Sequence, residues 1–553
     1  MNRIYRGGQQ SVCFYSFLLI FSITFFLSCA TKKENKDKQI FRYNEVSNIA
    51  SLDPAFAKDQ AMIWVDNQLY NGLFQLDSSL NVLPCIAKGY DISEDGLTYT
   101  FHLRDDVYFH KDKCFKNDTR KVVAQDFVYS FNRIIDEKVA SPGLWIFEHV
   151  KKSDNKYSFS AIDDSTLRIE LESVFPPFLG LLTMPYSFVV PKEAVEYYGE
   201  DFRKHPVGTG AFKFKYWKEG VKLVLLKNEN YFEKDSLGNP LPYLDAVNIS
   251  FIVDKQSVFL EFIKGNIDFL SGIDPNYKDE ILTHKGELQP KYKDKINLQK
   301  LPYLNTEYLG FYMEKTKDNP LNDKLVRQAI NYGFDRNAMI RYMRNNIGIA
   351  GENGIVPYSL LPNKENKTNK YTYNPQKARK LLEQSGYYKQ KPIIRLSTTS
   401  SYLDLCKFIQ QQLGLLDMNV KIDVYPPAEL REMMAQGKTM WFRGSWIADY
   451  PDAENYLSLF YSKNFTPNGP NYTHFSNKEY DRLYVLASKE NDIQKREQLY
   501  SKMNDIVIEE APIVVLFYDE VLRFTQKNIC GLTPNAMNLL ILKTVYKKLE
   551  IRN

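Results

Sequence analysis

The chain has 553 residues, which is too long for a single hydrophobic core and predicts several structural domains. Hydrophobic residues make up 44% and charged residues 25%, so the composition is that of a globular protein and excludes a disordered or fibrous chain. The formal net charge of +5 is small and no long run of Lys or Arg occurs, so nucleic acid is not an expected partner.

The N-terminal segment has the pattern of an export signal. Arg3 and Arg6 precede the apolar run "VCFYSFLLIFSITFFLSC", which is too short and too close to the start to predict a membrane-spanning helix. The run ends in "FLSC", which resembles the lipobox of bacterial lipoproteins. That resemblance implies a signal peptide over residues 1–28, lipid on Cys29 and a flexible tether over residues 29–40. A plain cleaved signal and an uncleaved anchor are the alternatives.

Strand-like and helical patterns follow one another through the first half of the chain. Apolar residues at helical spacing predict helices within residues 61–74, 123–135 and 255–269. Alternating apolar residues predict strands within residues 97–109, 166–171, 186–190 and 246–253, and a pair of strands within 205–232. The irregular alternation of helices, strands and hairpins favours an α/β or mixed α+β protein without internal repeats.

The second half of the chain contains a helix with clear start and stop signals. Asn374 can cap it, Pro375 suits its first turn and Gly386 ends it. A further helix is predicted over residues 325–343. Strands are predicted at residues 392–398 and 420–426 around another helix, and residues 511–524 form a strand pair or one bent strand.

Cysteines and short motifs give no sign of catalysis. Once the signal is set aside, the remaining cysteines are widely spaced and form no CxxC pair: Cys85, Cys114, Cys406 and Cys530. They predict no zinc site; a Cys85–Cys114 bridge is open, and four isolated buried thiols are favoured. The "QGKT" sequence lacks the first glycine of a phosphate-binding loop, because Glu432 stands there. No HExxH or GxSxG motif occurs, so no enzyme, metal or cofactor is predicted.

Several long motifs, in order, resemble one bacterial family. They are "LYNGLFQLDSSLNVLPCIAKGYDISEDGLTYTFHLRDDVYFH", "VAQDFVYSFNRIID", "PVGTGAFKFKYW", "LNDKLVRQAINYGFDRNAMI" and "YNPQKARKLLEQSGY". Together they resemble the family 5 solute-binding proteins, which are the oligopeptide, dipeptide and nickel receptors of ABC importers. The resemblance covers essentially the whole chain after the predicted signal, and it is closest to the oligopeptide-binding protein.

The resemblance implies an α/β, two-lobed fold of the periplasmic-binding-protein type (type II, cluster C), with three domains and a hinge. Domain I would combine residues 41–71, 189–295 and 515–553, domain II would be the family-specific insertion 72–188, and domain III would be residues 296–514. The ligand would be enclosed between the lobes, and the closed complex would dock on the permease subunits of an importer.

The stretch "RGSWIADY" is similar to the ligand-binding strand of the oligopeptide-binding protein. By this resemblance Asp449 would pair with the α-ammonium of a peptide, Arg443 would receive its carboxylate and Trp446 would line a side-chain pocket. Backbone groups of Ser445 and Ile447 would bond to the peptide main chain. A clamp of this kind is physically reasonable, because a buried charge without a partner is costly.

The sequence departs from the family pattern at several positions. A histidine that assists carboxylate binding falls at Cys406, and a pocket tyrosine falls at Gly143, with Trp145 nearby as a substitute pocket wall. Asp452 and Glu454 are added after Asp449, where we expect them on the loop surface. An alternative function for Arg443 and Asp449 is simply to pair with each other.

These observations predict a monomeric, membrane-anchored lipoprotein that faces the periplasm or the cell exterior. It would bind peptides, deliver them to an importer permease and catalyse nothing. The same fold could instead bind another solute, such as a nickel chelate, haem or an oligosaccharide. A secreted hydrolase using Asp449, Asp452 or Glu454, and a signalling or adhesion protein, are more distant alternatives.

Overall fold

A computed structural model describes residues 38–548, apart from 155, 275–276, 318 and 361–369. The predicted signal over residues 1–28 and the predicted lipidation site Cys29 lie outside the described residues. The chain divides into two compact units, Met1–Gln39 and Ile40–Asn553. All described residues other than 38–39 belong to the second unit. Within the described part, no helix is both long and apolar enough to cross a membrane.

An 11-stranded sheet connects the two halves of the second unit. Its order is β10 (Phe212–Lys218), β11 (Lys222–Lys227), β12 (Ala246–Ser250), β1 (Ile40–Asn44), β13 (Phe269–Ser271), β19 (Ile513–Gln526), β14 (Ile296–Phe311), β18 (Trp441–Ile447), β16 (Ile393–Thr398) and β17 (Asn419–Val424). The short strand β15 (Ile349–Ala350) pairs with β19. β1 is parallel to β12 and β13, and β16 is parallel to β17 and β18, whereas the other neighbouring pairs are antiparallel.

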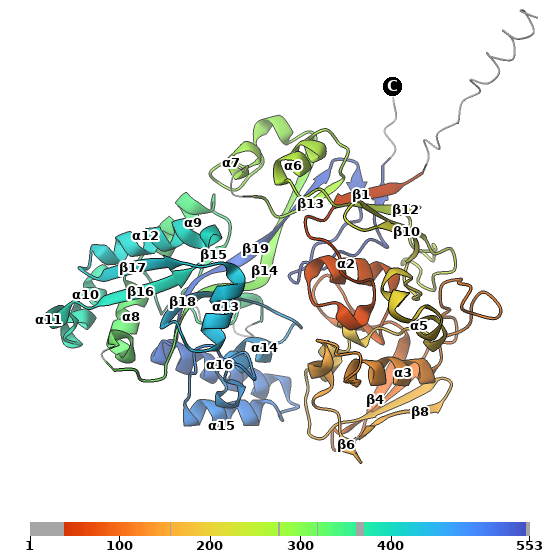
Figure 1. The fold of residues 1–553 in the computed structure, drawn as a ribbon, viewed down its shortest axis with the longest axis horizontal. Coiled ribbons are helices and arrows are strands. Elements are labelled where there is room, and N and C mark those ends of the chain that lie inside the picture. The colour runs from red at the N-terminus through yellow and green to blue at the C-terminus, as the bar shows by residue number, and fades with distance from the viewer. Residues whose placement is uncertain (1–37, 155, 275–276, 318, 361–369, 549–553) are drawn as a thin grey trace, which may run out of the picture. The chain divides into compact units, whose positions relative to one another are not determined.

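Strands β14 and β19 are the long strands that run from one half into the other (Figure 1). Their antiparallel register is interrupted between Pro302 and Thr306 and again between Glu307 and Tyr308. Residues 296–298 of β14 and 522–524 of β19 pack in one hydrophobic core, whereas residues 304–311 and 513–518 pack in others. The first interruption, between Pro302 and Thr306, therefore lies where the chain passes between cores, whereas the second lies within the part of β14 that packs in the second lobe.

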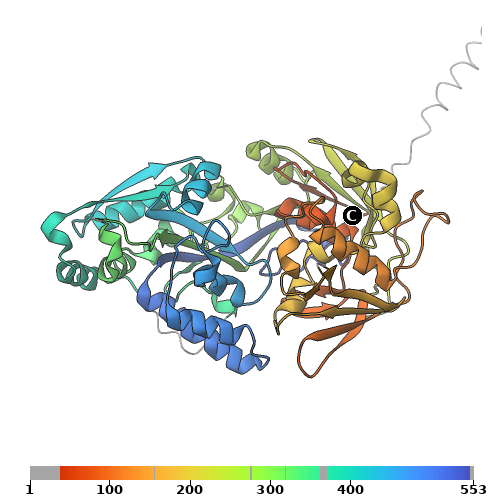
Figure 2. The same ribbon diagram turned by 60° about the horizontal axis from the view of Figure 1, so that its bottom comes forward.

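Separate cores define two lobes (Figures 1 and 2). The first lobe surrounds a core built from residues 41–269 and 529–545, to which Tyr450 also belongs. Its main elements are α2 (Gln60–Leu69), α3 (Ala124–Ile135), α4 (Phe178–Leu181), α5 (Lys192–Tyr198), and the antiparallel sheet β4 (Ala87–Ile92), β5 (Thr98–Leu103), β9 (Thr166–Glu170) and β8 (Phe159–Asp163). Pairs of short strands complete it, namely β2 (Phe74–Leu76) with β3 (Val82–Pro84), β6 (Lys152–Ser153) with β7 (Lys156–Tyr157), and β20 (Ile529–Cys530) with β21 (Tyr546–Lys547).

The second lobe surrounds two cores built from residues 304–518. Its helices are α8 (Lys324–Tyr332), α9 (Arg336–Met343), α10 (Pro375–Gln384), α11 (Tyr387–Gln390), α12 (Leu403–Gly414), α13 (Pro427–Ala435), α14 (Glu454–Leu457), α15 (Lys478–Ala487) and α16 (Ile493–Glu510). Two helices, α6 (Lys255–Ile263) and α7 (Lys278–Ile281), contribute to a smaller core beside β13.

Several local predictions are confirmed. The side chain of Asn374 accepts a hydrogen bond from the Lys377 N–H at the start of α10, Pro375 opens the helix, and Gly386 follows it with a φ of +74°. Residues 513–526 form one bent strand, β19, rather than a pair. The four cysteines at positions 85, 114, 406 and 530 are all free thiols, although Cys114 and Cys530 are only partly buried.

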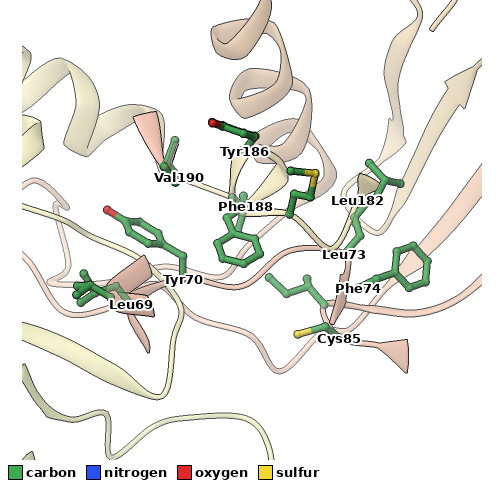
Figure 3. Packing of buried hydrophobic residues seen from close by; sticks show 14 of the residues in the cluster. Leu69, Tyr70, Leu73, Phe74, Cys85, Leu182, Tyr186, Phe188 and Val190 are labelled. Carbon is green, nitrogen blue, oxygen red and sulfur yellow. The ribbon is translucent and has the colours of Figure 1, made fainter. Parts of the chain in front are cut away.

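Two local predictions are wrong. No strand forms at residues 186–190, because Pro185–Ser187 is a 3-10 turn in which the Ser187 hydroxyl lies 2.8 Å from the carbonyl oxygens of both Leu182 and Met184, its hydrogen-bond acceptors. The helix expected over residues 325–343 is two helices, α8 and α9, because Asp335 caps a new helix by accepting from the Ala338 N–H at 2.9 Å. Figure 3 shows Tyr186 and Phe188, from residues 186–190, in the same hydrophobic cluster as Leu69, Tyr70, Leu73 and Phe74.

Candidate functional site

Strand β18 carries most of the predicted site residues. It is paired with β14 along its whole length, so that Ser445 lies opposite Glu307 and Ile447 opposite Asn305. On its other side, the described residues pair with β18 only at Phe442, which meets Ser397 of β16. The strand edge formed by Arg443–Ile447 is therefore free to pair with another extended chain.

Asp449 lies just beyond the end of β18 and has no charged partner among the described residues. Its backbone N–H donates to the Asn455 side-chain oxygen at 3.2 Å, and the Asn455 amide donates to its carboxylate at 3.4 Å. Asp449 is exposed, yet enough protein surrounds it that desolvation raises the pKa of its carboxyl. Such an acid can gain substantially from a cation placed against it.

Asn455 also fixes Trp446. The Trp446 indole N–H donates to the same Asn455 oxygen at 2.9 Å, so one buried amide positions both the aspartate and the tryptophan. Trp446 is half-buried beside the second-lobe core that contains Leu304 and Tyr308. Sequence reasoning missed Asn455, although its place in α14, six residues after Asp449, is within reach of such a contact.

Arg443 does not pair with Asp449. Its guanidinium donates to the carboxylate of Glu307, a buried residue that is 2% exposed, and it stacks on the ring of Tyr402 at 3.5 Å from the centroid. The suggested pairing of Arg443 with Asp449 is thus wrong in this structure. Cys406, on the neighbouring helix α12, is 1% exposed, and burial raises the pKa of its thiol, so it supplies no positive charge there.

The first lobe reaches this site through aromatic residues. Trp145 lies 6.3 Å from the ring of Tyr450, and a Cβ added at Gly180 of α4 would touch the Cβ of Tyr450 at 3.7 Å. Tyr450, the residue after Asp449, packs in the first-lobe core, and burial and then the charge of Asp449 raise the pKa of Tyr186 to about 12. Asp449 of the second lobe therefore faces the first lobe.

Tyr186 explains a departure from the family pattern. A Cβ at position 143 would lie 2.3 Å from the Tyr186 ring, so the space that a tyrosine at Gly143 would need is already filled. Sequence reasoning proposed Trp145 as the substitute and missed Tyr186, because it placed residues 186–190 in a strand. In the structure both aromatic side chains stand near the loop after β18.

The expectation that Glu454 lies on the loop surface is wrong. Glu454 is 4% exposed and accepts hydrogen bonds from the hydroxyls of Tyr450 and Tyr484. Burial raises its pKa to about 7, an effect that the two hydroxyls partly oppose. Asp452 is half-buried and accepts a hydrogen bond from the Glu454 N–H at 2.8 Å. Both carboxylates therefore stabilise the loop that follows β18 through contacts within the protein.

A hollow of about 390 Å³ lies between the first-lobe core and the smaller core of α6 and α7. Its walls include Glu45, Gln60, Trp64 and Phe259. Burial, and then the charge of Asp59, raise the pKa of Glu45 to about 7. After burial, the charges of Asp449 and Asp59 both contribute to the raised pKa of Tyr186.

The described residues do not bring together three or more His, Cys, Asp or Glu side chains in an arrangement suited to a metal ion. Asp449, Asp452 and Glu454 are engaged by an asparagine, a backbone N–H and two tyrosines, respectively. The arrangement therefore offers one exposed acid, a free strand edge and aromatic walls, which are features suited to binding a ligand.

Comparison with known proteins agrees with this geometry. Residues 81–468 match the family described as "Bacterial extracellular solute-binding proteins, family 5 Middle". The glutathione-binding protein GsiB of Salmonella typhi is 28% identical over 500 residues, which cover 88% of this chain and 90% of that protein.

Solved structures show the same fold. The ABC transporter-associated periplasmic binding protein DppA of Helicobacter pylori, in complex with the peptide STSA, has a TM-score of 0.75 and 27% identity, and the match covers 94% of this chain and all of that chain (100%). A dipeptide-binding protein of Pseudoalteromonas sp. SM9913, in complex with Met-Leu, has a TM-score of 0.74 and 22% identity, covering 92% and 100% of the two chains. The predicted two-lobed fold is confirmed.

Proposed function

Because the chain belongs to the bacterial extracellular solute-binding proteins of family 5, we propose that it binds peptides between its lobes and delivers them to the permease of an ABC importer. The observation that carries the peptide assignment is Asp449, an exposed acid without an ion pair among the described residues, at the end of a strand with a free edge. A peptide offers an ammonium for the acid and a main chain for the edge.

The roles proposed for the neighbouring residues follow from their places. Ser445 and Ile447 supply backbone groups on the free edge of β18. Trp446 is held by Asn455, and Trp145 stands by Tyr450, so both can wall a side-chain pocket. The domain limits inferred from the family, at residues 72–188 for the insertion, remain part of this proposal, as do the absence of catalysis and the monomeric state.

The peptide assignment is tested by calorimetry with mixtures of di- to pentapeptides. Replacing Asp449 with Asn removes the charge but keeps the shape, and loss of a buried charge pair should weaken binding by about 30-fold or more. Asp164→Asn, in an exposed turn between β8 and β9, is the matched control and should bind normally. Absence of heat with every peptide, or equal affinity in Asp449→Asn, contradicts the assignment.

Identification of the natural ligand provides a second test. The protein is purified without denaturation, and the molecules that it retains are measured by mass spectrometry. Mixed peptide masses are expected, because an ammonium clamp and backbone pairing do not read sequence. A single metal chelate, haem or oligosaccharide would assign the fold to another solute.

We also propose that Cys29 carries lipid and holds the protein at a membrane, facing the periplasm or the cell exterior. The "FLSC" sequence after an apolar run supports this. Incorporation of a labelled fatty acid and recovery in the membrane fraction are the expected results. Cys29→Ser should abolish both, and a lipid-free wild type would refute the anchor.

A further inference from the structure

Arg443 and Glu307 form a buried ion pair near the N-terminal end of β18, which is the end away from Asp449. Glu307, on β14, accepts from the Arg443 guanidinium, from the Tyr402 hydroxyl at 3.2 Å and from the Asn305 amide at 3.2 Å. The Arg443 side chain is only 15% exposed, and the central carbon of its guanidinium lies 3.5 Å from the centroid of the Tyr402 ring. Both partners are thus held by several contacts in one arrangement.

The charges around this pair are balanced. Asn305 connects Glu307 to Asp519 through a contact of 3.5 Å, and Asp519 pairs with Arg344 at 2.6 Å. Arg443 and Arg344 are therefore matched by Glu307 and Asp519. The nearby Cys406 thiol adds no charge, because burial raises its pKa and keeps it protonated. This end of the site is neutral, whereas the Asp449 end carries an uncompensated acid.

Because the Arg443 end of the site is neutral, a ligand carboxylate can bind there in only two ways. It must either displace Glu307 from Arg443, which leaves a buried carboxylate without its cation, or approach a guanidinium whose charge is already compensated. Displacement is unfavourable, because a buried charge that loses its partner is strongly destabilised. Approach without displacement places two carboxylates side by side, which disfavours the ionised state of one of them.

We propose that Glu307 is a specificity-determining residue that occupies Arg443 and makes a free C-terminal carboxylate unnecessary for binding. This inference rests on the proposed peptide-binding function and deepens it. The ligands are peptides anchored through their ammonium group, including those whose carboxyl end is amidated or extends into a longer chain.

The experiment uses equimolar libraries of random tripeptides in three forms: free acids, C-terminal amides and N-acetylated acids. Retained peptides are counted by mass spectrometry. Wild-type protein should retain acids and amides to within about threefold, because no net positive charge awaits the carboxylate, and should exclude the N-acetylated form. Glu307→Gln keeps the shape but frees the charge of Arg443, and it should favour acids over amides by roughly tenfold or more. Glu287→Gln, at an exposed position, is the matched control and should behave as wild type.

The outcomes separate the two proposals. Wild-type retention of acids tenfold above amides, with N-acetylated peptides excluded, overturns the role of Glu307 and leaves peptide binding intact. Retention of no library overturns peptide binding and this inference with it. The wild-type comparison needs no variant, so it decides the question even if Glu307→Gln fails to fold.

Discussion

Replacing Glu454 with Gln should change how the stability of the protein depends on pH. Glu454 is buried behind the ligand loop, and burial raises its pKa from 4.5 to about 7 despite hydrogen bonds from Tyr450 and Tyr484. The folded state therefore keeps a proton that the unfolded state releases between pH 4.5 and 7. The stabilising contribution of this group is full at low pH and is lost as the pH rises through that window.

The size of the effect follows from the same shift. A difference of roughly 2.5 pH units between folded and unfolded pKa values, at about 1.4 kcal/mol per unit, amounts to about 3 kcal/mol. The glutamine introduced by the substitution cannot ionise, so the stability of Glu454→Gln relative to wild type should rise by about that amount from pH 4.5 to pH 8. Glu45, whose pKa is also raised to about 7, acts equally in both proteins and cancels in the difference.

Urea unfolding of both proteins at several pH values between 4.5 and 8 measures this difference. Glu429→Gln, at an exposed position in α13, is the matched control and should follow the wild type at every pH. A stability difference between Glu454→Gln and wild type that stays constant over this range refutes the reasoning. It would mean that Glu454 is not desolvated as its contacts indicate.

Two further predictions concern the site. Desolvation raises the pKa of Asp449, and only the ionised acid pairs with an ammonium. Peptide affinity should therefore decline by up to about tenfold per pH unit as the pH falls through this pKa. Calorimetry from pH 7 to 4 measures the decline, and a constant affinity contradicts it. Gly143→Ala should lower the free energy of unfolding by about 1–3 kcal/mol, because the new Cβ would lie 2.3 Å from the Tyr186 ring. Adding Tyr186→Ala should recover part of that loss in the same unfolding assay, and strictly additive effects would show that the two positions do not clash.

Local sequence signals predicted the elements whose patterns arise within one segment. The helix α10 carries its own cap, first-turn proline and terminal glycine, so neighbouring structure was not needed to place it. The turn at residues 186–190 was misread because its side chains are buried by tertiary packing rather than by strand alternation. Strand β14 gave no alternating pattern, since its residues 304–311 are all buried, including Asn305, Thr306 and Glu307.

In the candidate site, too, the residues within one segment could be predicted, whereas their partners from other segments could not. "RGSWIADY" is contiguous, so the family pattern could indicate Arg443, Trp446 and Asp449 together. The partners that decide what these residues can do come from elsewhere, and Glu307 is 136 residues away from Arg443 in the chain. Because the two side chains meet only when β14 and β18 pair, the charge of Arg443 looked available in the sequence and is compensated in the fold. Asp449 lies beyond the end of β18, where β14 offers it no counter-ion. Because Arg443 lies within β18 and is paired with Glu307, the charge that is open to a ligand is that of Asp449 and not that of Arg443.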